Sequence, residues 1–171
     1  GTNGSTPATV TIVVDNHLII GVASYELTIP LPDYTFRGSI VSLDTQTGQE
    51  QWRLYTTTND AQGGAGGSVW SSAAVDTARK LAFIGTGQSY EAPASPLTDS
   101  VLAINYETGA LVWKNQYTKD DVYTTVALGP GQDFDIGATP TLVRTKNRDL
   151  VVAGSKAGIL KALDRDTGAE A

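Results

Sequence analysis

The sequence predicts an all-β protein, a β-propeller of four-stranded antiparallel blades, with about three blades in its 171 residues. The first observation is a turn motif, Leu-Asp-x-x-Thr-Gly in outline, whose glycines are Gly48, Gly109 and Gly168. It therefore recurs after 61 and then 59 residues. The second is a composition rich in glycine and β-branched residues, and the third is the lack of sustained 3.6-residue periodicity. Four short strands in each unit of about 60 residues are typical of a propeller blade.

The first unit contains four expected strands. Residues 10–14 and 18–22 flank Asp15-Asn16-His17, which is a plausible hairpin turn. Residues 36–43 lead into the first Thr-Gly turn, and residues 50–55 leave it. A β-sandwich would also have short strands, but it would not repeat one turn motif at this period.

The two later units follow the same order. We expect their strands at residues 71–75, 81–85 and 100–104 in the second unit, and at 139–143, 150–154 and 159–163 in the third. The glycine-rich stretch 63–67 lies inside a repeat, so we expect a tight loop there and not a hinge between domains. The whole chain, 1–171, is then a single partial propeller.

The Thr-Gly turn has a physical basis. Its aspartate accepts hydrogen bonds from turn amides, its threonine adds a hydroxyl, and its glycine supplies a positive φ. Trp52 and Trp113 each follow the turn glycine by four residues, and we expect them to pack between neighbouring sheets. The third copy would place its tryptophan at position 172. We therefore expect this chain to be part of a longer repeat array.

Composition excludes several classes of function. A formal charge of −6 and a pI near 4.6 argue against a nucleic-acid partner, whose phosphates would be repelled. No apolar stretch is long enough for a transmembrane segment. Without cysteine, these residues can form no disulfide, zinc thiolate site or covalent c-type haem site. The one histidine, His17, has no second histidine or cysteine for a metal site, and we expect it to be exposed and without function.

Beyond the turn motif, four segments resemble one family. They are residues 35–44 (TFRGSIVSLD), 67–76 (GSVWSSAAVD), 85–90 (GTGQSY) and 133–138 (DFDIGA). In this order they resemble the quinoprotein alcohol dehydrogenases that use pyrroloquinoline quinone (PQQ), and most of all the polyvinyl-alcohol-dehydrogenase-like branch. The resemblance implies a ring of seven or eight blades, of which this chain would hold about three, with PQQ and Ca²⁺ as cofactors and an alcohol or polyol substrate. It also implies an external electron acceptor such as a cytochrome, and a periplasmic or secreted location.

The resemblance assigns three residues to the quinone. Trp70 matches the tryptophan whose ring lies flat against PQQ, and Ser68 matches a hydroxyl residue that bonds the cofactor. Lys156 matches a basic residue at the quinone carbonyl oxygens, where a cation stabilises the reduced cofactor. The alternatives are a tryptophan that packs between blades and a lysine in an exposed turn.

It also assigns the acid residues. Asp133 matches the base that takes the proton of the substrate hydroxyl while hydride passes to the quinone. Glu26 matches a carboxylate ligand of calcium, and Gln88 stands where the family has an asparagine ligand. Asp135 would face the same way as Asp133 in an extended segment, as a second metal ligand or base. The structural alternatives are a solvated loop glutamate and an aspartate-rich turn that caps its own backbone.

Three functions therefore remain open from the sequence. The first is part of a PQQ- and calcium-dependent alcohol dehydrogenase. The second is a non-catalytic propeller of the same repeats that serves as a protein-binding scaffold, and the third is a PQQ-binding sensor without turnover. The co-occurrence of Trp70, Glu26, Asp133 and Lys156 favours the enzyme, because a scaffold has no need to combine them. The glutamine at position 88 favours a relative that has lost its metal.

Overall fold

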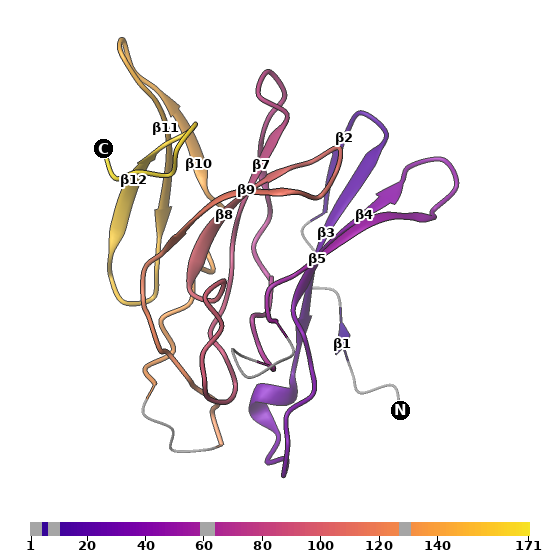
Figure 1. Ribbon diagram of the computed structural model, residues 1–171, viewed down its shortest axis with the longest axis vertical. Helices are drawn as coiled ribbons and strands as arrows, with labels where there is room; N and C mark the ends of the chain where they lie inside the picture. Colours follow the sequence, from indigo (N-terminus) through magenta and orange to yellow (C-terminus); the bar gives the residue numbers. More distant parts are fainter. Residues whose placement is uncertain (1–4, 7–10, 59–63, 127–130) are drawn as a thin grey trace.

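The computed structural model describes residues 5–6, 11–58, 64–126 and 131–171, and it contains three antiparallel sheets in chain order (Figure 1). Val10 and Gly63, which belong to two predicted segments, lie outside the described residues. The first sheet contains β1 (Ser5–Thr6), β2 (Ile12–Val14), β3 (His17–Ser24), β4 (Ser39–Asp44) and β5 (Glu50–Tyr55). A single turn of 3-10 helix, η1 (Glu26–Thr28), follows β3.

The second and third sheets repeat the arrangement. The second contains β6 (Ala74–Asp76), β7 (Leu81–Gly85), β8 (Ser100–Asn105) and β9 (Leu111–Gln116), paired in that order. The third contains β10 (Thr141–Arg144), β11 (Asp149–Gly154) and β12 (Leu160–Asp164). Among the described residues no helix could cross a membrane.

The third sheet has three strands where four were predicted per blade. Its fourth strand is represented only by an isolated bridge between Leu163 and Glu170. Glu170 follows Gly168 by two residues, as the first residues of β5 and β9 follow Gly48 and Gly109. The bridge therefore lies where a fourth strand begins in the other two sheets.

Three further expectations need correction. The strand predicted at residues 71–75 is shorter and begins at Ala74. The strand predicted from residue 139 begins at Thr141, because Pro140 has no N–H for the ladder. His17 was expected to be exposed, but it is the first residue of β3 and is half-buried. Its Nδ1 lies 3.0 Å from the Ser42 hydroxyl, and its ring meets the edge of Tyr106 in the second sheet. The histidine is therefore a packing residue between two sheets.

The central sheet supplies the hydrophobic core on both of its faces. Along β8, Leu102 and Ile104 face the first sheet, while Val101 and Ala103 face the third. Side chains on a strand alternate between the two faces, so a strand between two sheets is apolar throughout. This is why β8 appears in the sequence as a continuous apolar run.

Each interface between sheets is closed by a tryptophan that lies on a glycine. Trp52 Nε1 donates to the Tyr106 carbonyl at 2.9 Å, and Trp113 Nε1 donates to the Arg165 carbonyl at 3.1 Å. A Cβ on Gly109 would lie 2.7 Å from the Trp52 ring, so the glycine permits this close contact. The predicted role of both tryptophans in packing between sheets is confirmed.

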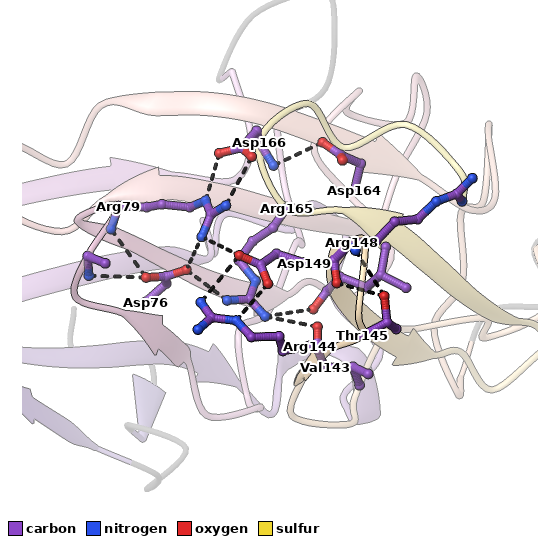
Figure 2. A network of polar contacts seen from close by, with 12 residues as sticks. Asp76, Arg79, Val143, Arg144, Thr145, Arg148, Asp149, Asp164, Arg165 and Asp166 are labelled. Carbon is purple, nitrogen blue, oxygen red and sulfur yellow. Dashed lines mark hydrogen bonds and ion pairs between the residues drawn. The ribbon is translucent and has the colours of Figure 1, made fainter.

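Ion pairs also join the second and third sheets (Figure 2). Arg165, in the turn after β12, donates from Nη1 to Asp76 Oδ2 at 2.8 Å, and both side chains are almost fully buried. Burial alone would raise the pKa of Asp76, but hydrogen bonds from Arg165 and Arg79 outweigh it and lower the pKa. Arg79 also contacts Asp149 and Asp166 of the third sheet, at 3.0 and 2.7 Å. The pairing is therefore a network, in which each buried charge has an opposite partner.

The first interface has a related contact at the same position of the repeat. Tyr106, which like Arg165 follows the second residue of the turn motif, donates to Asp15 Oδ2 at 2.9 Å. Asp15 lies in the hairpin turn between β2 and β3. A motif residue of one sheet thus contacts an acid of the preceding sheet in both interfaces.

Two of the turn glycines give a matched test of the docking contact. Gly48 and Gly109 have similar positive φ values, 71° and 74°, but a Cβ on Gly48 would meet nothing within 4 Å. We expect Gly48→Ala to cost about 1 kcal/mol of unfolding free energy from backbone strain alone. We expect Gly109→Ala to cost about 3 kcal/mol, because its methyl group also displaces Trp52. Urea unfolding of both variants measures the difference, and equal costs would contradict the docking role.

Candidate functional site

The predicted site residues lie in loops at one end of the sheets. Glu26 and Lys156 come two residues after the ends of β3 and β11, and Gln88 comes three residues after the end of β7. These are the equivalent strands of the three sheets, so their ends lie at the same end of the molecule. Ser68 and Trp70 precede β6, and Asp133 and Asp135 precede β10. The fold thus brings all seven candidates to one region.

Lys156 contacts three of the other candidates. Its Nζ is 2.7 Å from Asp133 Oδ1 and 2.6 Å from Asp135 Oδ2. It also lies 5.3 Å from the centroid of the Trp70 ring. Burial would lower the pKa of Lys156, but the hydrogen bonds to the two aspartates outweigh it and raise the pKa. The lysine is therefore a cation at neutral pH, in contact with two acids and an aromatic ring.

The two aspartates differ in exposure. Asp135 is buried, and its Oδ1 accepts a hydrogen bond from the Gln88 backbone N–H at 3.0 Å. Burial raises the pKa of Asp135, while Lys156 opposes that rise. The Asp133 side chain stays about one third exposed. Both carboxylates face Lys156, but the segment is not extended as expected, because Asp133 has φ = 55°.

Trp70 does not have the role of the other tryptophans. A Cβ on Gly137 would lie 1.9 Å from Trp70 Cη2, so the ring lies directly against the backbone there. The residue is nonetheless 39% exposed and belongs to none of the buried clusters of the described chain. Part of a flat aromatic surface is therefore open beside a lysine. That combination suits a planar anionic ring system such as PQQ.

Ser68 and Glu26 belong to a buried hydrogen-bond network beside the tryptophan. The Ser68 hydroxyl lies 2.7 Å from the Tyr90 hydroxyl and accepts from the Ser24 N–H at 3.4 Å. Glu26 Oε2 accepts from the backbone N–H groups of residues 35 and 36, at 3.2 and 3.0 Å. Burial raises the pKa of Tyr90 to about 12, with smaller effects from the Asp135 and Glu26 carboxylates. Glu26 is thus a buried acceptor and not a solvated loop residue.

The predicted metal ligands have suitable chemistry but are engaged with protein groups. Glu26, Gln88 and Asp135 offer only oxygen donors, which a hard cation such as calcium prefers. Gln88 Nε2 donates to the Tyr123 carbonyl at 3.3 Å, and Asp135 Oδ2 is bonded to Lys156. In the part of the chain that the structure describes, no group of three or more His, Cys, Asp or Glu residues could hold a metal. A cation that bound Asp135 would compete with Lys156 for that oxygen.

Two buried acids at the site were not singled out from the sequence. Asp121 is buried and accepts from the backbone N–H groups of Gln132 and Phe134, at 2.9 and 3.0 Å. Asp99 is fully buried, and neither of its carboxylate oxygens has a hydrogen-bond partner among the described residues. Burial, and next the charge of Asp121, raises the pKa of Asp99 to about 9. Asp121 and Asp99 stand in polar loop segments, where an aspartate usually caps its own turn.

The raised pKa of Asp99 predicts a dependence of stability on pH. Between its ordinary pKa of 3.8 and about 9, the folded protein binds a proton that the unfolded chain has released. This contribution is fully present below pH 4 and is lost as the pH rises toward 9. We expect Asp99→Asn to be more stable than the parent by about 2 kcal/mol at pH 8 and similar to it at pH 4. Urea unfolding at both pH values measures this, with the exposed Asp33→Asn as control, and an unchanged pH dependence would contradict it.

A comparison with known families matches almost the whole chain. The family described as the PQQ glucose/ethanol/alcohol dehydrogenase β-propeller domain matches residues 3–171. A polyvinylalcohol dehydrogenase of Pseudomonas sp is 36% identical over 155 residues, which cover 79% of this chain and 24% of the relative. The quinohemoprotein alcohol dehydrogenase ADH-IIG of Pseudomonas putida is 26% identical over 91% of this chain and 24% of its own length. The chain thus spans about a quarter of the length of these relatives.

Solved structures agree on the fold. A europium-containing methanol dehydrogenase matches 99% of this chain and 34% of its own chain, with a TM-score of 0.78 and 22% identity. The quinohemoprotein alcohol dehydrogenase of Comamonas testosteroni matches 92% of this chain and 27% of its own, with a TM-score of 0.72 and 21% identity. The predicted resemblance and the predicted β-propeller architecture are both confirmed.

Proposed function

The chain belongs to the family of PQQ-dependent glucose, ethanol and alcohol dehydrogenase β-propellers, and on that premise we propose that it supplies the central site of an alcohol dehydrogenase. The whole protein would oxidise a hydroxyl group by hydride transfer to the quinone. The observation that carries the proposal is the contact of one cation, Lys156, with Asp133, Asp135 and the partly open ring of Trp70.

The quinone would be held by residues of the second and third sheets. The exposed part of the Trp70 ring offers a flat apolar surface, and Lys156 offers a positive charge beside it. Ser68 would add a hydroxyl, which in this structure is shared with Tyr90. When bound, PQQ supplies a two-electron acceptor, which none of the side chains provides.

Asp133 would act as the general base. A carboxylate that is partly exposed can meet a substrate hydroxyl and take its proton as the carbon loses hydride. Its hydrogen bond with Lys156 keeps the carboxylate oriented. Lys156 also stabilises negative charge that develops on an oxygen near Trp70.

A calcium ion would bind through Glu26, Gln88 and Asp135. Two carboxylates and one amide give three oxygen donors, and a hard cation would take others from water or ligand. Asp135 Oδ2 is bonded to Lys156, so a metal ion that used this oxygen would compete with the lysine. We therefore place calcium in the cofactor-bound protein. Its removal would leave the ion pairs of Lys156 with Asp133 and Asp135 intact.

The proposal includes an alcohol or polyol as substrate and an external electron acceptor such as a cytochrome, in the periplasm or outside the cell. The polyvinylalcohol dehydrogenase of Pseudomonas sp is named for a polymeric alcohol. A polymer substrate fits a base that is partly exposed, because a long chain must reach it from solvent. The alternative, a non-catalytic scaffold, has no use for an acid pair and a cation beside an open indole.

Substitution of the proposed base tests the function directly. In the full-length protein with PQQ and calcium, we expect Asp133→Asn to lower kcat for an alcohol by 10²- to 10⁴-fold, roughly the contribution of a general base. PQQ binding should change little, because Trp70 and Lys156 remain. Asp120→Asn, an exposed aspartate that also has a positive φ, is the matched control and should retain full activity. A dye-linked assay measures the rates, and an unaffected rate for Asp133→Asn would exclude its role as the base.

A further inference from the structure

We propose that Asp121 is a positioning residue, whose buried carboxylate holds the loop that carries Asp133 so that Asp133 faces Lys156. This inference rests on the proposed function of Asp133 as the base. It assigns a role to a residue that lies in another segment of the chain and whose side chain binds Gln132 and Phe134, not Trp70 or Lys156, among the described residues.

The contacts are directed at both neighbours of Asp133. Asp121 Oδ1 accepts from the Gln132 N–H at 2.9 Å, and Oδ2 accepts from the Phe134 N–H at 3.0 Å. One carboxylate therefore binds the amide before Asp133 and the amide after it. Asp121 is only 3% exposed, so water competes little for these bonds. Hydrogen bonds to an ionised acceptor are about twice as strong as those between neutral groups.

The loop needs such a restraint because its backbone is strained. Asp133 has φ = 55°, in the left-handed region that L-residues with a side chain rarely adopt. Residues 131–137 form no strand, and within the described chain their backbone–backbone hydrogen bonds lie at Gly131, Asp135 and Ile136, with none at residues 132–134. A strained conformation persists only where surrounding groups determine it. The two amide bonds to Asp121 do so at the residues that flank the strained position.

Asp121 is itself fixed to the second sheet. Its carbonyl accepts from the Ser89 N–H at 3.3 Å, and the Tyr123 N–H donates to the Ser89 carbonyl at 3.0 Å. Val122 also forms a parallel bridge with Ser89. Ser89 follows Gln88, whose backbone N–H binds Asp135. The loop that carries Asp133 and Asp135 is thus held against the segment after β7 by two contacts, one through Asp121 and one through Gln88.

The substitutions can separate this role from general stability. Asp121→Asn keeps the size of the side chain but retains only one acceptor for two amides. Asp121→Glu keeps both acceptors and the charge on a longer stem. Gly131→Ala leaves the Asp121 side chain unchanged, but the new Cβ would clash with the Val122 carbonyl oxygen and with Asp121 Oδ1 and would push the loop away from both. Asp120→Asn, at the neighbouring exposed position, is the control.

The experiment compares these variants in the full-length protein with PQQ and calcium. We expect Asp121→Asn to lower kcat by about 10- to 100-fold with KM and the Kd of PQQ changed less than threefold. Asp121→Glu should recover part of the rate, and Gly131→Ala should lose it as Asp121→Asn does. Hydrogen exchange of the amides of residues 132–134 should become faster in Asp121→Asn, a readout that does not depend on turnover.

A double-mutant cycle with Asp133→Asn decides the outcome. If Asp121 acts through Asp133, Asp121→Asn will cost little further rate once Asp133 is replaced. An equal cost in both backgrounds, or a wild-type kcat in Asp121→Asn, would overturn the proposal while leaving the base assignment intact. If Asp133→Asn alone has no effect, the proposed function fails first, and the positioning role fails with it. If Asp121→Asn does not fold, Gly131→Ala and Asp121→Glu carry the same comparison.

Discussion

The contact of an indole ring with a glycine of the next sheet is the interaction on which the rest of this structure depends. Trp52 lies on Gly109 in this way, and Trp113 lies on Gly168. Each contact fixes the spacing between two sheets, because no Cβ fits beneath the ring. It also fixes their relative rotation, because each indole N–H binds a carbonyl of the next sheet. Apolar side chains then pack on both faces of the central sheet.

The two ends of the sheets differ in how their charged side chains are partnered. β11 starts beside the end of β12, where Arg165 binds Asp76 and the charged network closes the interface (Figure 2). β11 ends at the opposite end, where Lys156 meets the acids of the preceding loop. Charges at the first end are neutralised by fixed partners and stabilise the fold. Lys156 and its acids lie instead beside an aromatic ring that is partly open to solvent, which is an arrangement suited to a ligand.

The sequence predicted the features that recur in every sheet, and it missed features that occur only once. The strands, the turn motif and the docking tryptophans follow from a period of about 60 residues, because every sheet needs the same turn and the same contact. The seven candidate residues came from resemblance, and the structure brings them together through loops at equivalent strand ends. Asp99 and Asp121 were missed because burial and hydrogen bonding depend on partners that are distant in sequence and have no repeated position. The half-buried His17 was missed for the same reason, since Tyr106 comes from another sheet.

The central claim is that three tryptophans of one chain have two roles, two as packing contacts between sheets and one as a surface for a cofactor. A crystal structure of the full-length protein with PQQ and calcium tests it most directly. The account predicts that the quinone lies flat on Trp70 with Lys156 beside it, while Trp52 and Trp113 remain on their glycines. A quinone bound elsewhere, or a Trp70 ring covered by protein side chains, would contradict it.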